Sequence, residues 1–324
     1  MNKHLFYTVL AIVILSFTGC SCPVRQKNNP VVDKQTYSFA VKGTDTLKLD
    51  KYEVINTTKD TLSRPVLLFA FGGGFKGGER DEAYYIPYFH FLAENGYVVV
   101  STDYRTELKH ADPSKMADPM GFAATLQQAI GAAVEDFYGA TRYVVENGDN
   151  WKIDPEQIVA CGSSAGAITV LQAEYEICNQ SKQAQLLPEG FNYAGVISFA
   201  GAICSMGAPQ WKNLPCPIML FHGNADRTVP FEKAVLNDMG LWGSNFIAGQ
   251  LKENQSPYYF YLAEDAGHEM ANIPMENNRY DILGFLNRFV SNHQKLFINT
   301  TETVPGKPYA PKDFTLQDYI RNNM

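Results

Sequence analysis

A serine lies at the centre of the segment Gly162-Ser163-Ser164-Ala165-Gly166, which joins an apolar run to a stretch with the pattern of a helix. The spacing Gly-x-Ser-x-Gly predicts a tight strand-to-helix turn that exposes the hydroxyl of Ser164, from where it could attack a carbonyl carbon. Glycine is expected at 162 and 166 because a Cβ there would collide with neighbouring backbone. The pattern alone is a weak signal, because a glycine-rich loop without chemistry has the same composition.

An acid and a histidine follow this serine in the chain, and each comes directly after an apolar run of the strand type. We expect His268 to take the proton from Ser164 and later to give it to the leaving group. We expect Asp226 to fix the imidazole tautomer and to stabilise its cation. Glu264 and Asp265 are alternative acids, but they share the loop of His268, which makes a bond to its ring awkward.

Three consecutive glycines follow a further apolar run in the segment Phe71-Gly72-Gly73-Gly74-Phe75. Attack on a carbonyl forms an oxyanion, which serine hydrolases stabilise with N–H groups aimed at the developing charge. Consecutive glycines let the backbone turn such groups into the site without side chains in the way. We therefore expect the oxyanion hole to consist of the N–H groups of Gly73, Gly74 and Ala165, the residue after the nucleophile.

Together these motifs resemble the α/β-hydrolase superfamily and, within it, the carboxylesterases and the hormone-sensitive-lipase-like esterases. The chain order of serine, acid and histidine is that of this superfamily, and differs from the order in chymotrypsin-like and subtilisin-like enzymes. Phe71 stands where many of these esterases have a histidine, and Ser163 where many have an acidic residue. The likeness covers about residues 64–292 and includes, besides the motifs above, residues 95–105, 133–136, 143–147 and 153–158.

Apolar runs alternate with helical patterns from residue 64 onward, which predicts an α/β fold with a mostly parallel, doubly wound sheet and helices on both faces. Two runs before it predict an antiparallel N-terminal start. Because Phe71, Ser164, Asp226 and His268 each follow a strand, we expect them at one edge of the sheet. The expected strands are residues 36–41, 46–57, 64–70, 97–102, 158–163, 195–200, 217–222 and 258–262, and the expected helices are residues 81–95, 121–147, 166–178, 231–238 and 278–292.

The N-terminus has the pattern of an export signal. Residues 5–17 are apolar but too few to span a bilayer, and the segment Phe17-Thr18-Gly19-Cys20 is similar to a bacterial lipobox. The resemblance implies cleavage before Cys20 and lipid attachment to it, hence an exported lipoprotein anchored to a membrane in the periplasm or at the cell surface. The expected organisation is a signal peptide over 1–19, a polar tether over 20–35, the hydrolase domain over 36–298 and a C-terminal tail over 299–324.

Charge and histidine spacing argue against several partners. The net charge is −7 and basic residues do not cluster, so nucleic acid is not expected as a partner. His90, His110 and His293 lack metal-ligand spacing, and His222 at the end of a strand is expected to be structural, so no metal and no other cofactor is expected.

Two long segments and the cysteines add further expectations. Residues 107–119 are expected to be a solvated loop or a wall of the pocket, whereas the apolar content of residues 239–255 favours a lid over the acyl pocket. Cys178 could approach Cys216, while Cys204 is expected at the opposite sheet edge from Cys216, and the disulfide pairing stays open.

The resemblance implies hydrolysis of a carboxylic ester through an acyl-enzyme. The export signal favours a small-molecule or glycan ester as the substrate. Its acyl group would be short, such as acetyl, or would be feruloyl. A serine peptidase or amidase of the same fold is an alternative, because residues 222–230 look more like the acid loop of dienelactone hydrolases and prolyl-oligopeptidase-type peptidases. A non-catalytic binding lipoprotein is a third interpretation. The acyl chain, the alcohol and the oligomeric state stay open.

Overall fold

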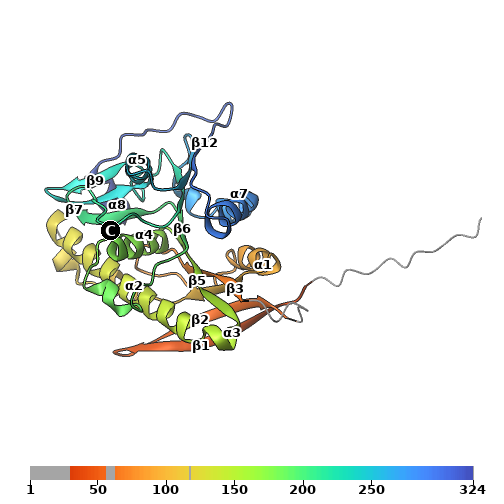
Figure 1. Cartoon of the computed structure of the whole chain (residues 1–324). Helices are drawn as coiled ribbons and strands as arrows, with labels where there is room; N and C mark the ends of the chain where they lie inside the picture. The colour runs from red at the N-terminus through yellow and green to blue at the C-terminus, as the bar shows by residue number, and fades with distance from the viewer. Residues whose placement is uncertain (1–29, 56–62, 117, 324) are drawn as a thin grey trace, which may run out of the picture. The chain divides into compact units, whose positions relative to one another are not determined.

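The computed structural model describes residues 30–55, 63–116 and 118–323. Cys20, the predicted signal peptide and most of the predicted tether lie outside the described residues. Within the described part, nine strands form one sheet in the order β1-β2-β4-β3-β5-β6-β8-β11-β12 (Figure 1). They are β1 (Val32–Lys42), β2 (Asp45–Val54), β3 (Arg64–Ala70), β4 (Val98–Thr102), β5 (Ile153–Ser163), β6 (Gly195–Phe199), β8 (Ile218–Gly223), β11 (Tyr258–Ala263) and β12 (Phe297–Glu302).

The sheet is parallel from β4 to β12, and β1 and β2 add an antiparallel start at its other end. Strands inside a parallel sheet are covered on both faces, so they read as continuous apolar runs rather than as alternating ones. Residues 66–70 of β3 illustrate this, because all five side chains are buried. The predicted mostly parallel sheet with an antiparallel start is confirmed.

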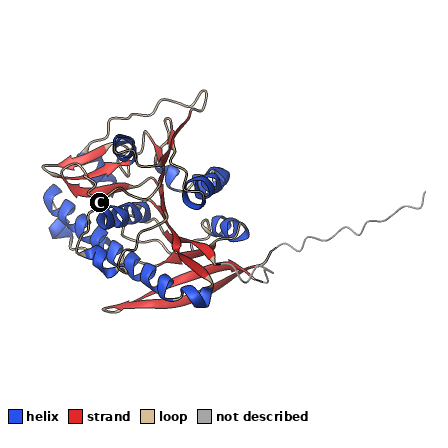
Figure 2. Ribbon diagram, viewed as in Figure 1, coloured by secondary structure: helices blue, strands red, loops and turns tan. Residues whose placement is uncertain are grey.

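Helices cover both faces of the sheet. In Figure 2, α2 (Pro119–Glu146) and α4 (Ala165–Cys178) lie on one face, and α1 (Ile86–Glu94) and α7 (Arg279–Phe285) lie on the other. The long helix α2 begins where the Asp118 carboxylate accepts hydrogen bonds from the N–H groups of Met120 and Gly121 and Pro119 takes the first position. Both features stabilise a helix N-terminus, since its first N–H groups have no partner within the helix.

A second, three-stranded sheet lies where the sequence predicted a helix and a lid. It has the order β7 (Ala202–Met206), β10 (Met239–Gly243) and β9 (Lys233–Leu236), all antiparallel. The helix expected over residues 231–238 is wrong, because Lys233–Leu236 pair with β10 as a strand that buries Ala234. Tertiary pairing here overrides the local pattern. The segment expected as a lid over residues 239–255 instead forms β10 and α5 (Ser244–Glu253), whose apolar side chains pack into the core.

Both ends of the domain extend beyond the expected bounds. β1 begins at Val32, inside the expected tether. Its pairing with β2 starts there, where Val32 lies opposite Val54. At the other end β12 pairs with β11 and lengthens the central sheet past residue 298. The chain then continues to the helix α8 (Leu316–Asn323), whose Tyr319 is buried.

The turn from β5 into α4 packs backbone directly on backbone. A Cβ on Gly166 would lie closer than 3.0 Å to the carbonyl oxygen of Ala70, at the end of β3. A Cβ on Gly162 would meet the carbonyl of Gly166 equally closely. Between them Ser164 has φ 52° and ψ −116°, a conformation that L-residues rarely adopt. The two glycines therefore make room for a strained serine at the strand end.

This packing predicts that Gly166→Ala lowers the free energy of unfolding by about 2 kcal/mol or more, because neighbouring backbone has to move. Urea unfolding measures the change. Gly249→Ala is the matched control, because Gly249 is exposed within α5 and a Cβ there meets no atom within 4 Å. The control should be neutral or stabilising by about 0.5–1 kcal/mol. Equal stability of Gly166→Ala and wild type would contradict the close approach.

Candidate active site

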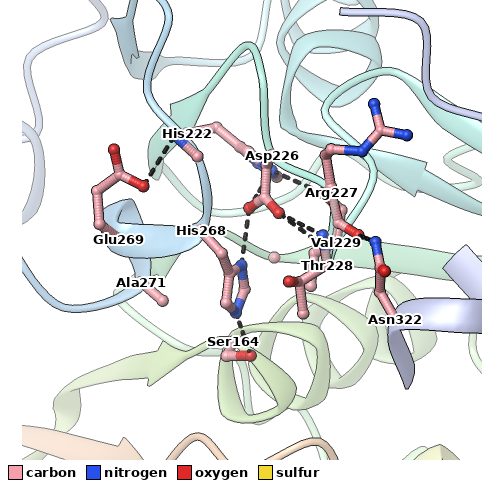
Figure 3. A network of polar contacts seen from close by, with 12 residues as sticks. Ser164, His222, Asp226, Arg227, Thr228, Val229, His268, Glu269, Ala271 and Asn322 are labelled. Atoms are coloured by element: carbon pink, nitrogen blue, oxygen red, sulfur yellow. Dashed lines mark hydrogen bonds and ion pairs between the residues drawn. The ribbon is translucent and has the colours of Figure 1, made fainter. Parts of the chain in front are cut away.

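Ser164 presents its hydroxyl to a histidine across the edge of the sheet. Its Oγ lies 2.8 Å from Nε2 of His268, in hydrogen-bond contact (Figure 3). The two residues are 104 positions apart in the chain and meet because both follow parallel strands, β5 and β11. Ser164 is half-buried, so its hydroxyl remains within reach of solvent.

His268 links this serine to an acid. It begins the short 3-10 turn His268–Ala271 after β11, and its Nδ1 lies 2.7 Å from Oδ2 of Asp226. A carboxylate can only accept, so this bond indicates that Nδ1 carries the hydrogen. Nε2 is then the ring nitrogen that accepts the hydrogen of the Ser164 hydroxyl. A general base acting on Ser164 needs this tautomer.

Asp226 is held on all sides at the end of β8. Its Oδ1 accepts hydrogen bonds from the backbone N–H groups of Thr228 at 2.8 Å and Val229 at 3.0 Å. Burial by itself would raise the pKa of Asp226, but the hydrogen bonds from His222 and His268 outweigh it and hold the pKa well below its usual range. The carboxylate is therefore ionised at neutral pH and can stabilise a positive charge on His268.

The alternative acids bond to other partners. Asp265 pairs with Lys312 at 3.2 Å and accepts the backbone N–H of Ala310 at 3.5 Å. Glu264 accepts a hydrogen bond from the Thr303 hydroxyl at 2.8 Å. Both carboxylates thus face the C-terminal segment rather than the histidine ring.

His222 is a second histidine on the same carboxylate, and its side chain is completely buried. Its Nε2 lies 3.3 Å from the carbonyl oxygen of Val229 and 3.4 Å from Oδ2 of Asp226. A carbonyl can only accept, so Nε2 donates, and Nδ1 accepts from the Ser244 hydroxyl at 2.8 Å. His222 therefore holds the acid loop from within the core, which agrees with the structural role expected for it.

The loop after β3 brings one of the two expected oxyanion glycines to the serine. Gly74 and Ala165 line a cavity beside Ser164, whereas Gly73 is absent from its walls. Gly73 has φ 134°, and its carbonyl oxygen accepts the N–H groups of Lys76 and Gly77 to close a tight turn. Gly73 is thus placed to shape the loop that carries Gly74.

This loop is fixed by aromatic residues. The N–H of Gly72 donates to the hydroxyl of Tyr85 at 2.9 Å, and the Tyr104 hydroxyl donates to the carbonyl oxygen of Phe71 at 2.7 Å. The Phe71 ring stacks on that of Tyr104 with 4.3 Å between centroids. Phe71, at the position where the resemblance would place a histidine, therefore packs in the core.

The cavity beside Ser164 is small and apolar. Its volume is about 10 Å³, room for about one water molecule. Its walls come from segments far apart in the chain: Leu108 from the segment after β4, Phe122 and Leu126 from α2, and Tyr319 from α8. Residues 107–119 thus contribute a wall of the cavity.

Comparisons with known proteins show the family to which the chain belongs. The model of the carboxylesterase family matches residues 18–184, just over half of the chain. The protein belongs to the carboxylesterase family. The matched region contains the glycine loop and the Ser164 turn, while Asp226 and His268 lie beyond it.

Two curated carboxylesterase relatives are similar over part of the chain. Esterase LipI of Mycobacterium tuberculosis is 33% identical over 110 residues, which are 34% of this chain and 28% of that protein. Esterase B1 of Culex pipiens is 28% identical over 138 residues, 40% of this chain and 23% of that protein. The alignments span only about a quarter of the length of these relatives.

Solved structures of a third esterase share the fold. The native structure of esterase 2 from Thermogutta terrifontis has a TM-score of 0.55 and 20% identity, over 87% of this chain and 96% of that chain. Its butyrate-bound structure has a TM-score of 0.56 and 19% identity, over 83% and 96%. The predicted α/β-hydrolase fold of this family member is thereby confirmed.

Tyr319 is one of the residues at the site that sequence reasoning missed, together with Phe122, Leu126 and Val229. The tail is polar and contains prolines, so its local sequence gives no sign that Tyr319 lines the cavity. The other wall residues of the cavity lie far from Tyr319 in the sequence. The heptapeptide from His222 to Thr228 held a clearer signal, since a histidine four residues before the acid can reach the same carboxylate from the strand end.

Other expectations for this carboxylesterase-family chain concern metals, thiols and membranes. Among the described residues, no group of three or more His, Cys, Asp or Glu side chains could hold a metal ion. Cys161, Cys178, Cys204 and Cys216 are free and buried, and the Cys178 thiol donates to the Glu174 carboxylate instead. Within the described ranges, the helices are too short or too polar to cross a bilayer.

A larger cavity of about 650 Å³ around the C-terminal end of α4 contains none of the three residues Ser164, Asp226 and His268.

The contacts of His222 predict that His222→Leu lowers the free energy of unfolding by about 1–3 kcal/mol, because the buried Val229 carbonyl loses its contact with the ring and the Ser244 hydroxyl keeps only its 3.4 Å bond to the Gly201 carbonyl. Urea unfolding measures this. His110→Leu is the control, since His110 is exposed and its replacement should change stability by no more than about 0.5 kcal/mol. Equal effects of the two variants would show that the His222 contacts contribute nothing.

The depressed pKa of Asp226 predicts a pH-dependent stability. Because its pKa is lower in the folded than in the unfolded chain, where it is about 3.9, the ionised carboxylate stabilises the fold above about pH 4. This contribution is lost as the pH falls toward the folded pKa. The stability difference between wild type and Asp226→Asn should therefore be smaller at pH 3 than at pH 7 by about 1 kcal/mol. A difference that stays constant in denaturant titrations at both pH values would contradict the assignment.

Proposed function

We propose that the protein is a serine esterase that hydrolyses carboxylic esters with short acyl groups. Ser164 is the nucleophile, His268 the general base and acid, and Asp226 the residue that orients and stabilises the imidazole. One observation carries this proposal: the continuous hydrogen-bonded series from Ser164 Oγ through the His268 ring to Asp226, with distances of 2.8 Å and 2.7 Å. Membership of the carboxylesterase family supports it.

In the first half-reaction, Ser164 Oγ attacks the ester carbonyl carbon while Nε2 of His268 takes its proton. The carbonyl oxygen becomes an oxyanion, which the N–H groups of Ala165 and Gly74 stabilise, while Gly73 closes the turn that carries Gly74. The imidazolium gives its proton to the alcohol oxygen, the carbon–oxygen bond breaks, and an acyl-enzyme remains. Removing one oxyanion donor typically costs about 3–4 kcal/mol of transition-state stabilisation.

In the second half-reaction, water replaces the alcohol. Nε2 of His268 takes a proton from the water as it attacks the acyl carbon, and then returns the proton to Ser164 Oγ as the carboxylic acid leaves. Asp226 stays ionised throughout, which its buried, four-contact environment supports. The half-exposed position of Ser164 allows water to reach the acyl-enzyme.

The small cavity favours a short acyl group. Its volume of about 10 Å³ leaves little space for anything larger than acetyl beside Ser164, so acetyl fits better than feruloyl. Esterase 2 from Thermogutta terrifontis, which shares the fold, has been solved with butyrate and with propionate bound, which supports a short acyl group here. We propose acetyl esters, including acetylated glycans, as the substrate class.

We further propose that the protein is an exported bacterial lipoprotein, anchored through Cys20 in the periplasm or at the cell surface. The support is the apolar segment of residues 5–17 and the lipobox-like sequence before Cys20. An enzyme tethered in this way would meet glycan esters outside the cytoplasm. Mass spectrometry of the N-terminus of the membrane-extracted protein tests this, and an unmodified Cys20 would overturn it.

The catalytic proposal predicts that the chain from residue 31 onward hydrolyses p-nitrophenyl acetate and that Ser164→Ala lowers kcat by about 10³-fold or more. Ser114→Ala is the matched control, since Ser114 is an exposed serine in the segment before α2, and it should retain wild-type turnover.

Two further outcomes sharpen this test. Paraoxon should inactivate the wild type and add one diethylphosphoryl group to Ser164, because a serine activated in this way attacks phosphorus as well as carbon. Esterase 2 from Thermogutta terrifontis has been solved phosphorylated by paraoxon. A folded wild type without ester turnover would reject the esterase proposal. Faster cleavage of the matching p-nitroanilide would favour the amidase alternative instead.

A further inference from the structure

The C-terminal helix α8 is attached to the loop that carries the proposed catalytic acid. Arg227, the residue after Asp226, pairs with Asp318 of α8 at 2.8 Å. The carbonyl oxygen of Arg227 also accepts the side-chain amide of Asn322 at 2.5 Å (Figure 3). Two contacts from one residue fix both the position and the rotation of this helix.

This attachment directs Tyr319 into the cavity beside Ser164. Tyr319 lies between Asp318 and Asn322 in α8 and is only 4% exposed. Its ring meets that of Phe122 edge to face, with 6.0 Å between centroids, and that of Phe314 at 6.4 Å. A tyrosine packed on two aromatic rings is held in place, so it acts as a fixed wall.

Tyr319 lines two apolar spaces. The cavity beside Ser164 and a second cavity of about 30 Å³ share three wall residues, Phe122, Leu126 and Tyr319. The second cavity continues toward the small sheet, where Leu236 and Leu241 line it. Of the shared residues, Phe122 and Leu126 belong to the core helix α2, whereas Tyr319 comes from the tail.

We propose that Tyr319 sets the acyl-chain length that the enzyme accepts, by closing the end of the cavity next to Ser164. This rests on the proposed esterase function. An acetyl group fits in front of the ring, and a longer chain meets it. With the ring removed, the two spaces join into one apolar slot that runs from Ser164 toward β9 and β10. The longer acyl chain then gains burial that it lacks in the wild type.

The test compares kcat/KM for p-nitrophenyl acetate and p-nitrophenyl hexanoate in wild type, Tyr319→Ala, Tyr319→Leu and Tyr319→Phe. The wild type should prefer acetate. The hexanoate-to-acetate ratio should rise about tenfold or more in Tyr319→Ala. It should rise less in Tyr319→Leu and stay unchanged in Tyr319→Phe, which retains the ring. Tyr309→Ala is the matched control, since Tyr309 is 74% exposed in the same tail, and its ratio should equal that of wild type.

The outcomes separate this inference from the function on which it rests. If the folded wild type hydrolyses neither ester, the esterase proposal fails. If it hydrolyses acetate but the ratio of Tyr319→Ala equals that of wild type, only the role of Tyr319 fails. Thermal unfolding and circular dichroism check each variant, and Tyr319→Leu decides if Tyr319→Ala does not fold. A wild type that hydrolyses hexanoate as well as acetate overturns the inference without any variant.

Discussion

The approach of α4 to the end of β3 is the constraint on which the site depends. The backbone at Gly166 lies so close to the carbonyl of Ala70 that no Cβ fits between them. The helix therefore starts immediately after β5, and Ser164 takes up the turn with a positive φ of 52°. This one contact places the hydroxyl of Ser164, the N–H of Ala165 and the glycine loop after β3 at the same point. The remaining residues of the site act on a position that the backbone has already determined.

The buried carboxylate of Asp226 is the second organising element. It accepts from Thr228, Val229, His268 and His222, so the loop after β8 is ordered by the group that it carries. The cost of burying an ionised group is offset because each of its oxygens has donors around it. The same bonds keep the hydrogen of His268 on Nδ1 and leave Nε2 to the serine. The same carboxylate, that of Asp226, thus orders the loop after β8 and sets the tautomer of His268.

Sequence reasoning succeeded where a short segment carries its own geometry. The turn around Ser164, the six parallel strands from β3 to β11 and the meeting of Ser164, Asp226 and His268 followed from apolar runs and from the rule that strand ends share an edge. It failed where long-range pairing decides. Lys233–Leu236 form a strand because β10 lies beside them, and β12 extends the sheet because it pairs with the edge of β11. Neither partner is visible in the local pattern.

The tail shows why such a failure affects the interpretation of the site. Chemistry and selectivity draw on different parts of this chain. The residues of the hydrogen-bonded series follow β5, β8 and β11, whose register the parallel ladder sets. Part of the cavity wall belongs to α8, which is attached to Arg227 on the acid loop and to Phe122 of α2. Since Arg227 is the residue after Asp226, a shift of α8 would act on the loop that orients His268. The tail that lines the cavity is therefore in contact with the loop that carries Asp226.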